Sequence, residues 1–196
     1  MKKIGFKNFR KFENFPTIAL GDVTYLVGQN NAGKSTLVKA AILMLENLRQ
    51  KSTIPLCDEA FFTFVSPVHD LHVETFARAL HRSSEEKRIQ FNATIGDFDF
   101  EITVIPTGDS ALYSSGQKDE DRVAPIEYFS VNDNKLGVKL EIQPLLKKYE
   151  LTIPEKSEDV EDYGDVKIFY EDEPIVRSSL QNSSQNINLN HISSFM

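Results

Sequence analysis

Apolar and polar residues alternate with two different periods along the opening of this 196-residue chain. Residues 4–9 follow a period of two, and residues 17–20 form a short β-like run after Pro16. The mostly β-forming run 23–27 comes next, so three short strands are predicted. Residues 37–45 are apolar at nearly every position, which indicates a largely buried helix. The opening therefore predicts a strand hairpin, a further strand, a glycine-bounded loop and a helix.

The rest of the chain is predicted to be mainly β-structure. Residues 89–95 and 98–104 alternate with a period of two around Gly96-Asp97, which predicts a β-hairpin. The other expected elements are a helix through 71–81, a mobile loop at about 106–124, strands at 126–131 and 138–142, a short helix at 144–149, a strand pair within 155–173, and a helix or frayed tail at 178–196.

The loop between the third strand and the first helix carries the most specific chemistry. Gly28 is followed after four residues by Gly33-Lys34-Ser35, which is the spacing of a phosphate-binding P-loop. Glycines permit close backbone approach, and the helix start adds unpaired N–H donors and the positive end of its dipole. Lys34 is expected to reach the β- and γ-phosphates, and the Ser35 hydroxyl to ligate Mg²⁺. We therefore predict nucleotide binding, with these candidate residues: Gly28, Asn30, Asn31, Ala32, Gly33, Lys34, Ser35 and Thr36.

Composition and charge bear on the partners and the location of the protein, and they leave the prediction of nucleotide binding unchanged. The net charge of −7 argues against a surface that is basic overall, although five basic residues fall within the first eleven. Those lysines also suit the solvated edge of a sheet. The chain has one cysteine, no apolar run long enough to span a membrane and no apolar N-terminal signal, so we expect a cytoplasmic protein without a membrane partner.

A family resemblance rests on two stretches of the opening. These are Gly5-Phe6-Lys7-Asn8-Phe9-Arg10-Lys11-Phe12 and the loop Gly28-x-Asn30-x-x-Gly33-Lys34-Ser35-Thr36 with its apolar helix. Together they resemble the N-terminal lobe of ABC-type ATPases of the SMC/RecF group, and most closely the ATPases of OLD-family nucleases and related anti-phage systems. The resemblance is strong over about the first 50 residues and general afterwards.

The resemblance implies an α/β fold with a P-loop core, an ABC/SMC-like half head, and a flanking antiparallel β-sheet. It also implies that residues 1–196 form a single ATP-binding lobe, the N-terminal part of a longer ATPase head. ATP and Mg²⁺ are the implied ligands, and Arg10 occupies the position that lies near the nucleotide in such families. Further implications are a homodimer or a partner ATPase or nuclease subunit, and DNA contact through the complete assembly.

The carboxylates that would complete an ATPase site are not evident in the sequence. Pro55 argues against a central strand before Asp58-Glu59, and Glu171 occupies the last apolar position expected before Asp172-Glu173. His191 is a weak candidate for the switch histidine, and His69 with His72 lacks a third metal ligand at fixed spacing. We therefore expect ATP binding with little hydrolysis by this chain alone.

The sequence leaves other functional classes open. One is a regulatory nucleotide sensor that binds ATP without turning it over. Another is a small P-loop kinase or GTPase, although no arginine-rich lid motif and no Asn-Lys-x-Asp motif for base recognition occurs in the chain.

Overall fold

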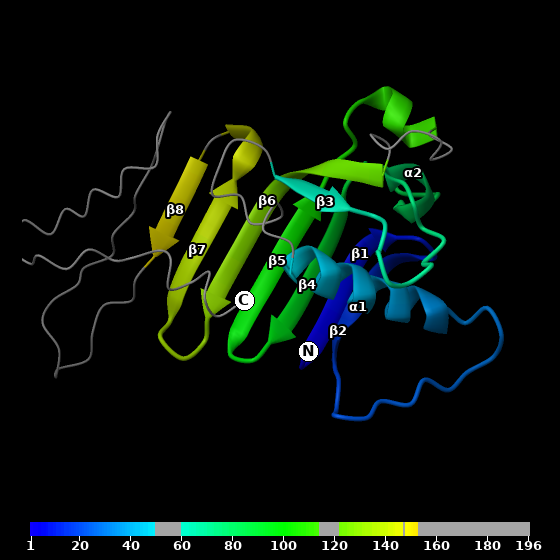
Figure 1. The fold of residues 1–196 in the computed structure, drawn as a ribbon, viewed down its shortest axis with the longest axis horizontal. Coiled ribbons are helices and arrows are strands. Elements are labelled where there is room, and N and C mark those ends of the chain that lie inside the picture. The colour runs from blue at the N-terminus through cyan, green and yellow to red at the C-terminus, as the bar shows by residue number, and fades with distance from the viewer. Residues whose placement is uncertain (50–59, 114–121, 147, 153–196) are drawn as a thin grey trace, which may run out of the picture.

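A computed structural model describes residues 1–49, 60–113, 122–146 and 148–152 (Figure 1). The strands in these ranges are β1 (Lys3–Phe9), β2 (Phe12–Ala19), β3 (Phe61–Thr63), β4 (Ile89–Ile95), β5 (Phe98–Val104), β6 (Val123–Asp133), β7 (Val138–Gln143) and β8 (Lys148–Thr152). The helices are α1 (Lys34–Arg49) and α2 (Phe76–Ala79), together with two 3₁₀ segments, η2 (Asp109–Tyr113) and η4 (Pro144–Leu146).

The described strands form an eight-stranded sheet in the order β2-β1-β4-β5-β6-β7-β8, with β3 paired to β6 outside this path. Every pairing is antiparallel. Most neighbours along the sheet are consecutive in sequence, and the exception is β1, which pairs with both β2 and β4. The chain therefore leaves the main strand path after β2, builds α1, β3 and α2, and returns with β4 beside β1.

The two hairpins predicted from alternation are confirmed. β1 and β2 pair from Lys3↔Ala19 to Phe9↔Phe12, so the second strand begins earlier than the sequence pattern indicated and includes Pro16. Proline lacks an N–H donor, and it is tolerated here because β2 is an edge strand of the described sheet. β4 and β5 pair over their full length, and Gly96 between them has φ +60°, a left-handed conformation that glycine adopts readily.

Helix α1 lies across one face of the sheet, as Figure 1 shows, and contacts β1, β3 and β4. Its buried apolar residues recur with helical spacing: Leu37, Ala40, Leu43, Met44 and Leu48. They meet the apolar side of the sheet, where every second residue of β4 and β5 is buried, so the core lies between helix and sheet. The predicted buried helix is confirmed.

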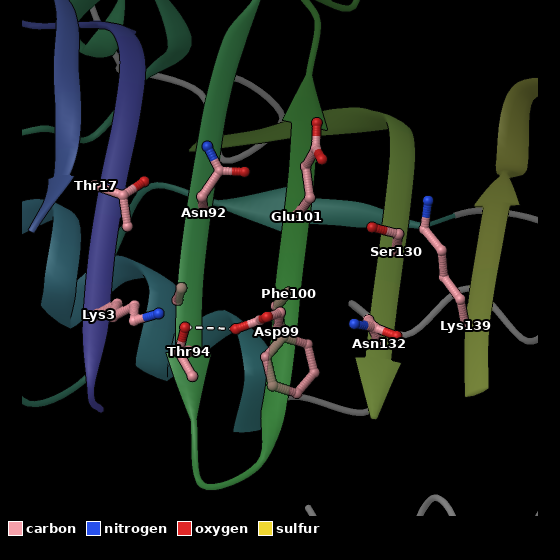
Figure 2. A pocket seen from close by; sticks show the side chains of 11 residues that line it. Lys3, Thr17, Asn92, Thr94, Asp99, Phe100, Glu101, Ser130, Asn132 and Lys139 are labelled. Atoms are coloured by element: carbon pink, nitrogen blue, oxygen red, sulfur yellow. Dashed lines mark hydrogen bonds between the residues drawn. The ribbon is translucent and has the colours of Figure 1, made fainter. Parts of the chain in front are cut away.

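The opposite face of the sheet carries mainly polar side chains. Figure 2 shows the side chains that line a cavity of about 350 Å³ on this face, from β2 to β7. Thr94 donates a hydrogen bond to the Asp99 carboxylate, and this bond is the main reason that the pKa of Asp99 lies below its usual value. Lys3 and Lys139 stand at the two sides of the same cavity. The alternation of buried and polar positions thus separates a core face from a solvated face.

The structure corrects several sequence predictions. Residues 23–27 carry no strand pairing within the described ranges, and Val23, Tyr25 and Val27 are 71%, 86% and 93% exposed. A β-forming sequence becomes a strand only where a neighbouring strand supplies hydrogen-bond partners, and the described sheet offers none to this segment. The P-loop helix is therefore present, but the strand expected to lead into it is an extended connection.

Two further corrections concern helices. The helix expected through 71–81 is limited to α2, four residues long, because the chain before it turns through left-handed residues at His72 and Glu74. The helix expected at 144–149 is the three-residue η4 followed by strand β8, which pairs with β7. Part of the loop expected at 106–124 forms η2 and the start of β6, while residues 114–121 lie outside the described ranges. Strand pairing with β7 thus overrode the local helix preference of the segment 148–149.

One buried polar residue, Asn47, ties α1 to β3 and generates a test of this arrangement. Its side-chain amide donates to the carbonyl oxygens of Leu43 and Thr63, each at 2.9 Å, and accepts from the Thr63 amide at 2.8 Å. Asn47 is 0% exposed, so removing its side chain leaves the backbone groups of Thr63 without these partners in a region shielded from water.

We expect Asn47→Ala to lower the free energy of unfolding by about 2 kcal/mol, measured by urea denaturation. Val38→Ala, on the partly exposed side of the same helix, is the matched control and should change stability little. Equal stability of Asn47→Ala and Val38→Ala would contradict the role assigned to this clamp.

Candidate functional site

The candidate site is the loop that joins the exposed 23–27 segment to α1. Gly28, Gln29, Asn30, Asn31 and Ala32 are all exposed, so the loop lies at the surface. Helix α1 begins directly after Gly33, whose φ of +99° suits glycine alone among common residues. The carbonyl oxygen of Gly33 accepts from the amides of Thr36 at 3.0 Å and Leu37 at 3.2 Å, which closes the first turn. The structure thus places a glycine-bounded loop at the N-terminus of a sixteen-residue helix.

Lys34 folds back over this loop. Its ammonium group donates to the carbonyl oxygens of Gly28 and Gln29, the second at 2.7 Å. A positive charge is therefore held directly above the loop whose backbone is expected to surround phosphate. An anionic ligand would offer the ammonium a stronger, charge-assisted partner than these neutral carbonyl oxygens.

The two hydroxyl residues of the motif differ in their surroundings. Ser35 is exposed in the first turn of α1, whereas Thr36 is 5% exposed and packs into the core. The accessible hydroxyl is a hard oxygen donor of the kind that Mg²⁺ accepts, and Mg²⁺ in nucleotide sites commonly takes few protein ligands beside phosphate oxygens and water. Ser35 therefore fits the role of a protein ligand to Mg²⁺.

Two residues that the sequence interpretation did not select contact the loop from the β1–β2 hairpin. The Lys11 ammonium donates to the carbonyl oxygen of Asn31, which has a left-handed φ of 65°. The Phe12 ring lies so close to Gly33 that a Cβ on this glycine would overlap it. Both residues directly follow Arg10 in the opening motif. This proximity in sequence to a candidate nucleotide contact is the signal that could have indicated them.

Arg10 itself points in another direction. Its guanidinium group donates to the His72 carbonyl oxygen at 3.2 Å, and partial burial lowers its pKa. Lys39 on α1 also has a lowered pKa, through burial and then through repulsion by the Arg10 charge. The structure therefore brings Arg10 toward α1 and the 70–74 segment, while Lys11 reaches the phosphate loop.

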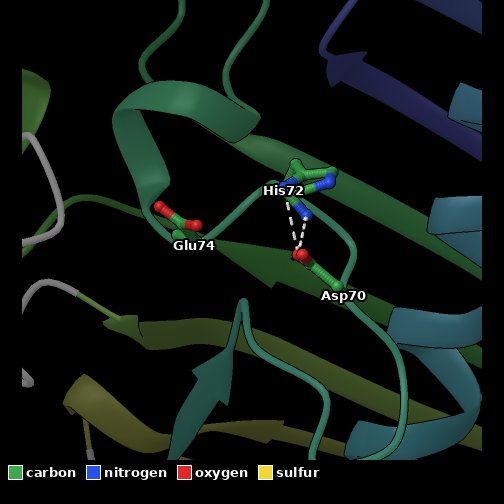
Figure 3. Close-up of side chains that lie close together, drawn as sticks. All are labelled: Asp70, His72 and Glu74. Atoms are coloured by element: carbon green, nitrogen blue, oxygen red, sulfur yellow. Dashed lines mark hydrogen bonds and ion pairs between the residues drawn. The ribbon is translucent and has the colours of Figure 1, made fainter.

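The 70–74 segment contains a group of side chains with metal-ligand chemistry. Figure 3 shows Asp70, His72 and Glu74, each offering one ligand atom, with these atoms within 4.8 Å of one another. His72 Nδ1 lies 3.1 Å from Asp70, and Glu74 forms an ion pair with Arg78. The nearby cations Arg10, Lys39 and Arg78 oppose a further positive charge here. Asp70 and His72 are thus paired with each other and Glu74 with Arg78 of α2, and His69 is not part of the group.

The candidates for the missing catalytic carboxylates and histidine lie outside the described residues. These are Asp58-Glu59, Asp172-Glu173 and His191.

Comparison with known protein families supports the chemistry of the loop. The family model described as "AAA ATPase domain" matches residues 1–195, which is nearly the whole chain. A search of curated proteins finds no match. No helix within the described ranges is both long and apolar enough to cross a membrane.

The close approach of Phe12 to Gly33 leads to a prediction for the loop. Gly33→Ala adds a Cβ that overlaps the Phe12 ring and also disfavours the left-handed φ, so the loop must move. We expect a loss of nucleotide binding, measured by calorimetry, with the fold retained by circular dichroism.

Gly96→Ala is the matched control for this variant. Gly96 also has a left-handed φ, of +60°, but nothing lies within 4 Å of the position of an added Cβ. This control should lose about 1 kcal/mol of stability and keep its nucleotide affinity. Normal binding by Gly33→Ala would show that the loop does not depend on this close approach.

Proposed function

Since this chain belongs to the AAA ATPase domain family, we propose that it binds ATP with Mg²⁺ through residues 28–36, as the ATP-binding lobe of a P-loop ATPase. The observation that carries the proposal is the Lys34 ammonium held over a glycine-bounded loop at the start of α1. A triphosphate is the ligand that such a loop accommodates best, because it offers several charged oxygens to backbone donors and one cation.

Each residue of the loop has a distinct part in the proposal. Gly28 and Gly33 allow the backbone to approach phosphate, and the exposed residues Asn30, Asn31 and Ala32 present main-chain amides. Lys34 contacts the terminal phosphates, and Ser35 holds Mg²⁺, which neutralises phosphate charge when bound. Thr36 contributes by closing the helix turn, since its amide already donates to Gly33.

The finer assignment is to the SMC/RecF/OLD type of ATPase head. It is supported by the opening motif from Asn8 to Phe12 and by an antiparallel sheet beside the P-loop helix. Work on DNA or in phage defence follows from that resemblance. So does assembly as a homodimer or with an ATPase or nuclease partner. Arg10 stays a candidate nucleotide contact on the same grounds.

Hydrolysis, in this proposal, requires a C-terminal lobe and a second head. Phosphoryl transfer needs Mg²⁺ held from two sides, an oriented water and additional charge stabilisation at the γ-phosphate. The loop supplies one side of that arrangement, and the sequence carries no convincing second set of carboxylates. The alternative is a regulatory sensor that binds ATP and signals without turnover.

The P-loop assignment is tested by Lys34→Ala. We expect ATP affinity to fall by about a hundredfold or more, because a charge-assisted contact to the terminal phosphates is lost, while the fold persists. Titration calorimetry with Mg²⁺ and ATP measures the change. Lys135→Ala, an exposed lysine in the turn between β6 and β7, is the control and should bind like the unmodified chain. Equal affinity in the two variants would exclude Lys34 from the site.

The need for further parts is tested by steady-state phosphate release from the 196-residue chain. We expect ATP binding without repeated turnover, and the same result for Asp172→Asn and Glu173→Gln. Robust turnover that is lost in either variant would show that this chain holds a complete ATPase site. Kinase or GTPase function would instead appear as phosphate transfer to an added acceptor or as a preference for GTP in the same titrations.

A further inference from the structure

The tip of the β1–β2 hairpin, residues Arg10–Phe12, lies against the phosphate loop although more than fifteen residues separate them in sequence. The turn between paired Phe9 and Phe12 has two central residues, and Arg10 at the first has φ 53°. Glycine is the usual residue at a position of this kind, because a side chain costs about 1–3 kcal/mol there. The tip therefore has a specific, strained conformation.

Contacts with the 72–81 segment hold this conformation. The Arg10 amide donates to the Ala79 carbonyl oxygen, and His81 Nδ1 lies 2.9 Å from the Arg10 carbonyl oxygen. The guanidinium group adds its bond to His72. Backbone and side chain of Arg10 are both anchored, so the two residues that follow it leave the tip in a fixed direction.

From this tip, Lys11 and Phe12 contact different parts of the loop. Lys11 binds the carbonyl oxygen of Asn31, at the exposed crest, and its own side chain is exposed. Phe12 is half-buried and lies against Gly33, where the loop enters α1. Its ring packs on Phe15 with centroids 5.1 Å apart and on Phe6 at 5.9 Å, so the sheet holds it in place.

We propose that Lys11 and Phe12 are positioning residues that set the conformation in which the phosphate loop receives ATP. The inference rests on the proposed function. The two contacts constrain the loop from outside, at its crest and at its junction with the helix. A loop ordered in advance loses less conformational freedom on binding, and its affinity for ligand is correspondingly higher.

The experiment compares two pairs of variants with matched positions. Lys11→Met keeps the aliphatic stem and removes the ammonium group, and Lys7→Met makes the same change at an exposed lysine of β1. Phe12→Leu removes the ring beside Gly33, and Phe98→Leu removes a partly buried ring of β5 that packs on Phe100. Lys11→Arg tests whether a restored donor rescues the effect.

Two measurements are made on each variant. The first is amide hydrogen exchange of peptides covering residues 28–36 in the nucleotide-free protein, and the second is ATP affinity by calorimetry. We expect faster exchange and about tenfold weaker affinity for Lys11→Met and Phe12→Leu, with unchanged melting for the exposed Lys11 variant. Lys7→Met and Phe98→Leu should match the unmodified chain in loop exchange, and Lys11→Arg should restore both quantities.

Loop exchange and ATP affinity unchanged in both Lys11→Met and Phe12→Leu would overturn the inference. Weaker affinity with unchanged exchange in the nucleotide-free protein would also overturn it, because that result describes a direct nucleotide contact. If Phe12→Leu fails to fold, Lys11→Met decides alone, since its side chain lies outside the core. If the unmodified chain does not bind ATP, the proposed function fails, and the exchange measurement still tests the loop contacts.

Discussion

A connected cluster of phenylalanine rings links the phosphate loop to the centre of the sheet, and the arrangement of the site depends on it. Phe6 on β1 stacks on Phe15 with ring centroids 4.6 Å apart and meets Phe9 edge-on at 5.6 Å. Phe9 contacts Phe91 on β4, which stacks on Phe62 of β3 at 5.1 Å. Phe12, at the loop end of this cluster, touches Gly33. Aromatic packing of this kind is rigid, so it fixes the position of the junction between the loop and α1 relative to the core.

Charge is distributed so that cations surround the loop while the sheet carries mixed charge. Lys34 lies over the loop and Lys11 at its crest, each bound to backbone carbonyl oxygens. Arg10 and Lys39 form a second positive region toward the 70–74 segment, and their mutual repulsion contributes to the lowered pKa of Lys39. This local excess of positive charge exists in a chain whose net charge is −7, which shows why overall charge is a poor guide to a single site.

Residues 23–27, which precede the loop, have the composition of a buried strand but lie exposed as an extended connection. Val23, Tyr25 and Val27 project apolar side chains into solvent within the described part of the chain. None of the described strands pairs with this segment. Its β-forming sequence and its exposure are therefore in conflict, and backbone pairing is what such a sequence would require to become a strand.

The sequence by itself determined the local features of this protein. Alternation at 89–104 was sufficient to predict the β4–β5 hairpin, and the apolar run after Ser35 was sufficient to predict α1. Both elements depend on the period of apolar residues and on nearby turn residues. The spacing from Gly28 to Ser35 predicted a glycine-bounded loop before α1, which the structure shows, and phosphate binding by that loop stays a prediction. Tertiary structure alone decided which distant groups meet. Lys11 and Phe12 reach the loop because β2 is folded back on β1, and Asn47 is buried because α1 crosses β3. It also decided that 23–27 has no strand partner among the described residues while 148–152 pairs with β7. Strand formation requires hydrogen bonds from another part of the chain, and no local pattern encodes that neighbour.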